Sequence, residues 1–146
     1  MFRGRKDLSL DGKGRITMPA KYRERMLAVA GGSMVITIDP SKCLLIYPLP
    51  MWEEVEAKLA AVATQHEANR KFTRFIVHNA EEVEMDAQGR FVIPPLLRQY
   101  AKLDKKVVMA GAINKIELWD EARYLEQQLD WPDAADLPPE IAGFAL

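Results

Sequence analysis

The sequence has little of what secreted, membrane-spanning or disulfide-stabilised proteins contain. Its single cysteine, Cys43, cannot form a disulfide within the chain, which fits a reducing compartment. No apolar run approaches the roughly 20 residues that a membrane-spanning helix needs. Residues 1–6 are not followed by the apolar stretch that marks a secretory signal. We therefore expect a soluble protein that stays in the cytoplasm and does not contact a membrane.

Groupings of residues that carry catalysis or hold metal ions are also missing. His66 and His78 are twelve residues apart, and Cys43 has no histidine close to it in sequence. The chain has no glycine-rich phosphate loop and no G-x-S-x-G motif. These absences predict a protein that is not an enzyme and that needs no metal, cofactor or small-molecule substrate.

The charge of the chain is distributed unevenly. With 146 residues, 49% hydrophobic and 28% charged, the composition is that of an ordinary globular protein. Its net charge of −1 hides a gradient. Residues 1–25 carry eight basic and three acidic side chains, a net +5, whereas residues 117–146 carry one basic and eight acidic, a net −7. The gradient is typical of a protein with a polyanionic partner near its N-terminus, although charged surfaces also serve solubility alone.

The most informative feature is an internal repeat. Residues 10–19 read Leu-Asp-Gly-Lys-Gly-Arg-Ile-Thr-Met-Pro, and residues 85–94 read Met-Asp-Ala-Gln-Gly-Arg-Phe-Val-Ile-Pro. Residues 44–47 and 116–119 match in the same order. In the ten-residue match the identical pairs are Asp11 and Asp86, Gly14 and Gly89, Arg15 and Arg90, and Pro19 and Pro94, and the same offset also pairs Arg23 with Arg98. Two similar units are therefore joined by a longer segment.

Each unit predicts the same local structure. An alternating apolar strand leads into Asp-x-x-Gly, where Asp suits the first position of a type I turn and Gly takes positive φ. We expect the following strand to close a hairpin through a G1-type bulge, and a short helix to begin at Pro19 or Pro94. These helices would bury Tyr22, Met26, Leu97, Tyr100 and Ala101. Further strands are expected at 34–38, 44–47, 107–110 and 115–119.

The segment between the units predicts two helices. Trp52, Val55, Leu59 and Val62 recur at helical spacing, and Ala68, Phe72, Phe75 and Ile76 form a second such pattern. Aromatic residues at this spacing favour a place in the core. We assign the first repeat to 5–52, a helical connector to 53–80, the second repeat to 81–124, and a flexible, acidic, proline-containing tail to 130–146. Because neither repeat is long enough to bury a large core alone, we expect both to share one β-rich core.

The paired motifs resemble the MraZ family. The likeness rests on Met1-Phe2-Arg3-Gly4, on the two Asp-x-x-x-Arg motifs with their prolines, and on Tyr22-Arg23, and it runs to about Trp119 and the helix beyond. It implies an α+β fold of two pseudo-symmetric SpoVT-AbrB (swapped-hairpin) half-barrels with short flanking helices. It also implies a transcriptional regulator of the cell-division and cell-wall gene cluster. The resemblance further implies that the partners are double-stranded DNA and further copies of the chain in a ring-shaped homo-oligomer, and that the location is the nucleoid.

The side chains expected at the DNA are basic. Arginine offers phosphate or guanine a planar fork, and basic arms contact phosphates without reading sequence. Asp11 and Asp86 either orient the arginines or only cap the turns, where Gly14 and Gly89 complete the motif. Arg23 either extends the basic surface or pairs with an acid, and the N-terminal arm is either a DNA contact or a frayed end. The expected DNA contacts are Arg15, Lys13, Arg3, Arg5, Lys6 and, with a weaker contribution, Arg90.

The second repeat departs from the first in its charge. Its turn has Ala87 and Gln88 where the first has Gly12 and Lys13, and Glu81, Glu82 and Glu84 precede it. We therefore expect the first repeat to contribute more to DNA binding. An alternative function is a protein-interaction module of antitoxin type, whose acidic tail folds on a partner.

Overall fold

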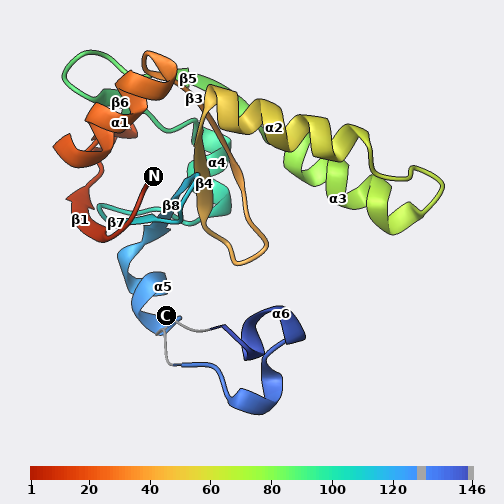
Figure 1. Ribbon diagram of the computed structural model, residues 1–146. Coiled ribbons are helices and arrows are strands. Elements are labelled where there is room, and N and C mark those ends of the chain that lie inside the picture. The colour runs from red at the N-terminus through yellow and green to blue at the C-terminus, as the bar shows by residue number, and fades with distance from the viewer. Residues whose placement is uncertain (128–130, 145–146) are drawn as a thin grey trace.

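The two repeats form the same elements in the same order. The computed structural model describes residues 1–127 and 131–144 (Figure 1). The first repeat contains β1 (Arg5–Ser9), β2 (Arg15–Thr17), α1 (Ala20–Ala30), β3 (Ser33–Ile38) and β4 (Leu44–Pro48). The second contains β5 (Glu81–Glu84), β6 (Arg90–Val92), α4 (Pro95–Tyr100), β7 (Lys106–Gly111) and β8 (Ile116–Asp120). All four further strands predicted from the sequence are confirmed.

Strands from the two repeats alternate in the sheets. A six-stranded sheet has the order β1-β7-β8-β4-β3-β5, and β2 pairs only with β6 in a two-stranded ribbon. In the first repeat β1 pairs with β7 of the second, and in return β5 of the second pairs with β3 of the first. The order therefore reads the same from either end when the repeats are exchanged, which is a pseudo-twofold arrangement.

The prediction that each turn closes a hairpin between its own flanking strands is wrong. The turns themselves form, because the Gly14 N–H donates to the Asp11 carbonyl at 3.0 Å and the Gly89 N–H to the Asp86 carbonyl at 2.9 Å. Both glycines have positive φ, as predicted. The strands then separate and pair with the other repeat. An isolated two-stranded hairpin leaves its apolar face in water, whereas the exchange places that face over a shared core.

One core lies between the six-stranded sheet and the β2–β6 ribbon. Successive residues of β3 point to opposite faces, so Met34 and Ile36 enter this core while Val35 enters a second cluster behind the sheet. Strands β4, β7 and β8 alternate in the same way, which explains their nearly continuous apolar sequences. The predicted α+β fold, with two pseudo-symmetric halves and one core, is confirmed.

The short helices after the ribbon strands close the ends of this core. Pro19 and Pro94 are the N-cap residues of α1 and α4, one position before the first helical residue. Tyr22 and Met26 of α1 and Leu97 of α4 are buried, as predicted. Ala101 is also buried, and Tyr100 packs against the same cluster while partly exposed.

The connecting segment forms α2 (Leu49–Ala60) and α3 (Glu67–His78), which run side by side away from the sheet (Figure 1). Only the ends nearest the sheet pack on it: Trp52 is buried, and the buried Thr37 hydroxyl donates to the Ile76 carbonyl at 2.7 Å. The prediction that Phe72 and Phe75 are core residues is wrong, because they are 54% and 61% exposed. The helical pair extends beyond the sheet (Figure 1), so within the described residues no sheet face covers these rings.

The C-terminal part of the chain packs little. After α5 (Glu121–Glu126), residues 131–144 form a 3-10 turn, η1 (Ala134–Asp136), and a single helical turn, α6 (Pro139–Ala142), and contain no buried residue. Residues 130, 145 and 146 of the expected tail lie outside the described residues. Within the part of the chain that the structure describes, no helix has the length and apolar character needed to cross a membrane.

The exchange of strands predicts that neither repeat folds as a monomer. A fragment of residues 1–63 lacks the partners of β1 and β2, and a fragment of residues 64–146 lacks those of β5 and β6. Far-ultraviolet circular dichroism and light scattering should show each fragment either unfolded or folded only as a dimer. Mixing the two should restore the spectrum of the intact chain. A folded monomer of either fragment would contradict the interlocked topology.

Candidate nucleic-acid interface

The first Asp-x-x-x-Arg loop is organised by its aspartate. Asp11 Oδ1 accepts the backbone N–H groups of Lys13 at 2.9 Å and Arg15 at 2.8 Å, and Oδ2 accepts Arg15 Nε at 2.6 Å. The same carboxylate therefore caps the turn and binds the arginine side chain. The backbone N–H of Arg15 and then its guanidinium hold the pKa of Asp11 below its ordinary value.

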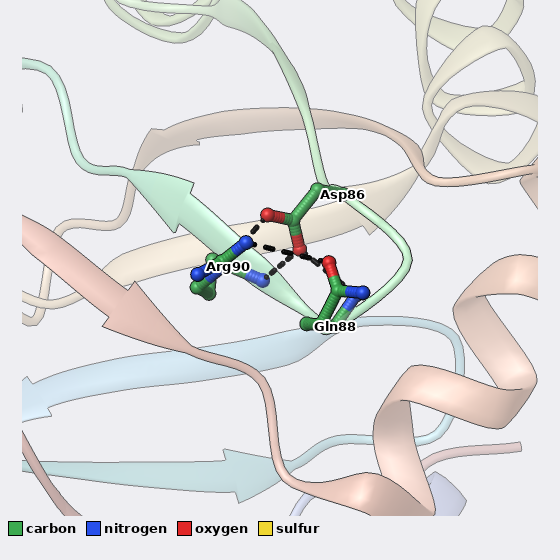
Figure 2. A network of polar contacts seen from close by, with 3 residues as sticks. All are labelled: Asp86, Gln88 and Arg90. Carbon is green, nitrogen blue, oxygen red and sulfur yellow. Dashed lines mark hydrogen bonds and ion pairs between the residues drawn. The ribbon is translucent and has the colours of Figure 1, made fainter.

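The second loop repeats this geometry (Figure 2). Asp86 Oδ1 accepts the N–H groups of Gln88 and Arg90, both at 2.9 Å, and Oδ2 accepts Arg90 Nε at 2.8 Å. The Arg90 N–H is the largest cause of a lowered pKa at Asp86. One difference is that Arg90 Nη2 also lies 3.4 Å from Gln88 Oε1. At the matching position the first loop has Lys13, a cation in place of an acceptor.

The ribbon places both arginines on one exposed face. In β2–β6, Arg15 lies opposite Val92 and Thr17 opposite Arg90. These four side chains are exposed, while Ile16 and Phe91 between them point into the core. Arg15 and Arg90 are diagonal neighbours across the two strands, so their Cα atoms are roughly 7–8 Å apart.

A groove of about 960 Å³ runs along the ribbon. Its lining includes the Asp-Arg pairs of both loops, with the apolar Leu8 of β1 and Val83 of β5. The two sides of the groove differ in charge. Glu84 lines the side of the second repeat, and its counterpart on the side of the first repeat is the uncharged Ser9. Sequence spacing alone did not predict that both motifs border one groove.

The arginine geometry suits recognition of an anion or a base edge. In each loop the carboxylate engages Nε. Within the described residues the Nη groups of Arg15 make no hydrogen bond, whereas Nη2 of Arg90 also lies 3.4 Å from Gln88 Oε1. The side chains of Arg15 and Arg90 are 60% and 65% exposed. Two parallel Nη–H donors match a phosphate or the N7 and O6 acceptors of guanine. The aspartate thus holds the stem of each arginine, and the fork stays available in full at Arg15 and in part at Arg90.

The expected N-terminal arm is paired with the rest of the fold rather than frayed, through an isolated bridge at Phe2 and strand β1 from Arg5. Phe2 is buried and exchanges two backbone hydrogen bonds with Ile113, and its ring meets that of Tyr22 edge-on at 5.8 Å. Arg3 and Lys6 are exposed beside it. Arg5 lies over the Tyr124 ring at 5.5 Å. By the register of β1 with β7, Arg5 and Lys6 point to opposite faces of the sheet, so the structure separates Arg5 from the ribbon face.

Arg23 and Arg98, which match each other in the repeat, both bind backbone carbonyls. Arg23 Nη2 donates to the Met18 carbonyl at 3.2 Å, and Arg98 Nε donates to the Ile93 carbonyl at 3.1 Å. The expectation that Arg23 pairs with an acid is not what the structure shows, since its partner is a backbone oxygen. Their match in the repeat was the available signal. In the described residues no cluster of histidine, cysteine and carboxylate side chains has the geometry to hold a metal ion.

Comparisons with known proteins agree on one family. The chain matches the family described as "MraZ protein, putative antitoxin-like" twice, over residues 1–75 and 76–134. Proteins named transcriptional regulator MraZ from Nitrosomonas europaea and Nitrosospira multiformis are 48% and 45% identical, with the whole of each chain covered. The Pseudomonas putida protein of that name is 48% identical over 122 residues, which is 83% of this chain and 81% of its own.

The Asp-Arg geometry predicts a selective change in carboxyl pKa. Because the native pKa of Asp11 is lowered, its stabilisation of the loop is complete above the ordinary value of about 3.9 and is lost as the pH falls through the lower native value. In an NMR titration, Arg15→Ala should raise the Asp11 pKa and leave that of Asp86 unchanged. Arg90→Ala should do the reverse. If the pKa of Asp11 is the same in the wild type and in Arg15→Ala, the ion pair does not form in solution.

Proposed function

This chain belongs to the MraZ family of transcriptional regulators, and we propose that it acts by binding short, repeated DNA sites as a homo-oligomer. The observation that carries this proposal is the β2–β6 ribbon with Arg15 and Arg90 on its exposed face. The major groove of B-DNA admits a two-stranded ribbon. The diagonal spacing of the two arginines, roughly 7–8 Å, spans about two base-pair steps of 3.4 Å. One ribbon therefore suits a short site.

The first loop contributes more of the attraction to DNA. Lys13 adds a cation where Gln88 adds none, and Glu81 and Glu84 of β5 stand where the repeat places Lys6 and Ser9. Over the whole unit, residues 5–25 carry seven basic and three acidic side chains, whereas residues 80–100 carry two basic and four acidic. A phosphate backbone is drawn to the first unit and repelled by the second.

The exposed aromatic rings of α3 support self-association. Phe72 and Phe75, three residues apart on one side of this helix, are exposed, and Val62 is exposed in the link that precedes it. Large aromatic side chains gathered on an exposed helix mark an interaction surface. A second copy of the chain is the proposed occupant, in an assembly of closed symmetry, because repeated subunits raise the effective concentration of each loop at repeated DNA sites. Catalysis has no part in this function, and its place is the cytoplasm, at the nucleoid.

An alternative is a protein-interaction module of antitoxin type. Apolar side chains in the C-terminal part favour it, since Trp131, Ile141 and Phe144 are exposed on residues 131–144. Such a segment would fold on a partner rather than on its own chain. Co-purification of a stoichiometric partner, lost when residues 131–146 are removed, would favour this alternative. Salt-dependent retention on DNA favours regulation.

DNA binding should depend more on Arg15 than on Arg90. We expect a footprint of repeated protection on DNA upstream of the protein's own gene. On that DNA, Arg15→Ala should weaken binding by roughly 1–3 kcal/mol per engaged site, and Arg15→Lys should also lose specificity because a point charge lacks the fork. Arg90→Ala should cost less. Gel-shift titrations at fixed salt measure all three.

The control for lost charge is Arg74→Ala, on α3 and away from the ribbon. Each variant is first checked for oligomeric state. Equal losses from Arg15→Ala and Arg90→Ala in correctly assembled protein would show that the repeats share the DNA equally. A wild-type protein that protects no upstream DNA would remove the proposed function.

Assembly should depend on the aromatic face of α3. The wild-type protein should form an oligomer well above 16.6 kDa, and Phe72→Glu with Phe75→Glu should shift it to smaller species by placing charge in an apolar contact. Phe144→Glu, at an exposed ring on the C-terminal segment, is the control and should leave the mass unchanged. Light scattering at micromolar concentration checks both. A wild-type monomer would refute self-association, and an unaffected double variant would place the contact elsewhere.

A further inference from the structure

Each glycine of the Asp-x-x-x-Arg loops lies against an arginine of the other repeat. A Cβ atom built on Gly14 would stand 2.7 Å from Nε of Arg98, and one on Gly89 would stand 2.6 Å from Nε of Arg23. Both glycines are buried although their loops are exposed. Glycine is therefore required at each of these positions for two reasons. The backbone has a positive φ, and a guanidinium occupies the space that a side chain would fill.

Hydrogen bonds extend this contact through the backbone. Arg98 Nε donates to the Ile93 carbonyl at 3.1 Å, and the N–H of Ile93 donates to the Gly14 carbonyl at 2.8 Å. Arg98 thus supports the first loop in two ways. Its guanidinium packs on Gly14, and it binds the carbonyl of Ile93, whose N–H donates to Gly14. All of these groups except Gly14 belong to the second repeat.

The mirror relation holds for the second loop. Arg23 Nη2 donates to the Met18 carbonyl at 3.2 Å, and the N–H of Met18 donates to the Gly89 carbonyl at 2.7 Å. The same chain of contacts therefore runs from α1 of the first repeat to the loop of the second. Two independent occurrences related by the pseudo-twofold arrangement make an accidental contact a poor explanation.

We propose that Arg98 and Arg23 are positioning residues that act across the repeats: Arg98 holds the loop of Arg15 in its binding geometry, and Arg23 holds the loop of Arg90. The proposal rests on the proposed function, in which those loops contact DNA. Arginine suits this place because its flat guanidinium packs on a glycine while Nε remains able to donate. Both side chains are half-buried, with a donor committed to the backbone, so their part is support.

The two supports are not equivalent. Arg98 bonds the backbone through Nε itself, the atom that lies over Gly14. Nε of Arg23 is buried and, within the described residues, has no hydrogen-bond partner. An unsatisfied buried donor weakens a contact, so the second loop is held less firmly than the first. The stronger support therefore belongs to the loop that carries Lys13 and Arg15.

The first experiment measures loop order in the intact, DNA-free protein by amide hydrogen exchange. Arg98→Met should speed exchange at residues 11–15 by about tenfold and leave residues 86–90 near wild type, and Arg23→Met should do the reverse. Arg98→Lys should act in the same direction as Arg98→Met, and serves where the methionine variant unfolds. Faster exchange in the loop of the mutated residue's own repeat, in both loops equally, or in neither would overturn the proposal.

The second experiment is a double-mutant cycle on upstream DNA. If Arg98 acts through the first loop, Arg15→Ala should lose at least about fivefold less affinity in the Arg98→Met background than in wild type. Arg90→Ala should lose the same factor in both backgrounds. Independent losses in both pairs would overturn the proposal. Arg98→Lys separates support from charge: wild-type affinity and salt dependence would identify a simple cationic contact, and reduced affinity at an unchanged salt slope supports positioning.

The two experiments distinguish failure of the proposed function from failure of the positioning role. A wild-type protein that binds no upstream DNA would remove the proposed function, while the exchange measurement on the free protein still decides whether each arginine holds the opposite loop. Normal DNA binding with no crossed exchange pattern would remove only the positioning role.

Discussion

The structure depends on the pairing of each repeat's first strand with the other repeat. Strand β1 is completed by β7, and β5 by β3, so neither unit has a covered apolar face until both are present. The exchange answers a problem of size, because a repeat of ~45 residues is near the lower limit for burying a core of its own. It also imposes the pseudo-twofold arrangement, in which β2 and β6 find each other at the centre.

The candidate interface is a consequence of that arrangement. Two loops far apart in the sequence border one groove because their strands form one antiparallel ribbon with a loop at each end. In each loop the aspartate binds the Nε of its own arginine, whose side chain is exposed. Symmetry of the backbone does not extend to charge. Lys13 and Gln88 at matching positions, and Glu84 opposite Ser9, give the two sides of one groove different potentials. The fold thus presents two equivalent geometries with unequal electrostatics.

Periodicity predicted the elements well where both sides of a strand are buried or where a turn demands glycine. The positions of β3, β4, β7 and β8 followed from apolar runs, and Gly14 and Gly89 have the positive φ that their turns require. Pattern failed at Phe72 and Phe75, because helical spacing shows that residues share a face and not that anything covers it. The motif also did not show the surroundings of Arg5, which lies over the Tyr124 ring.

The sequence by itself determined the repeat, the paired Asp-x-x-x-Arg motifs, the charge difference between the units and the family to which they point. These are local properties that survive any arrangement of the chain. Only the tertiary structure decided which strands pair, that both arginines share one face, and that Arg23 and Arg98 lie on the glycine of the opposite loop. A turn with its flanking strands is equally compatible with a closed hairpin or an exchanged one. The choice is made by burial of apolar surface between the two repeats, which no single segment contains.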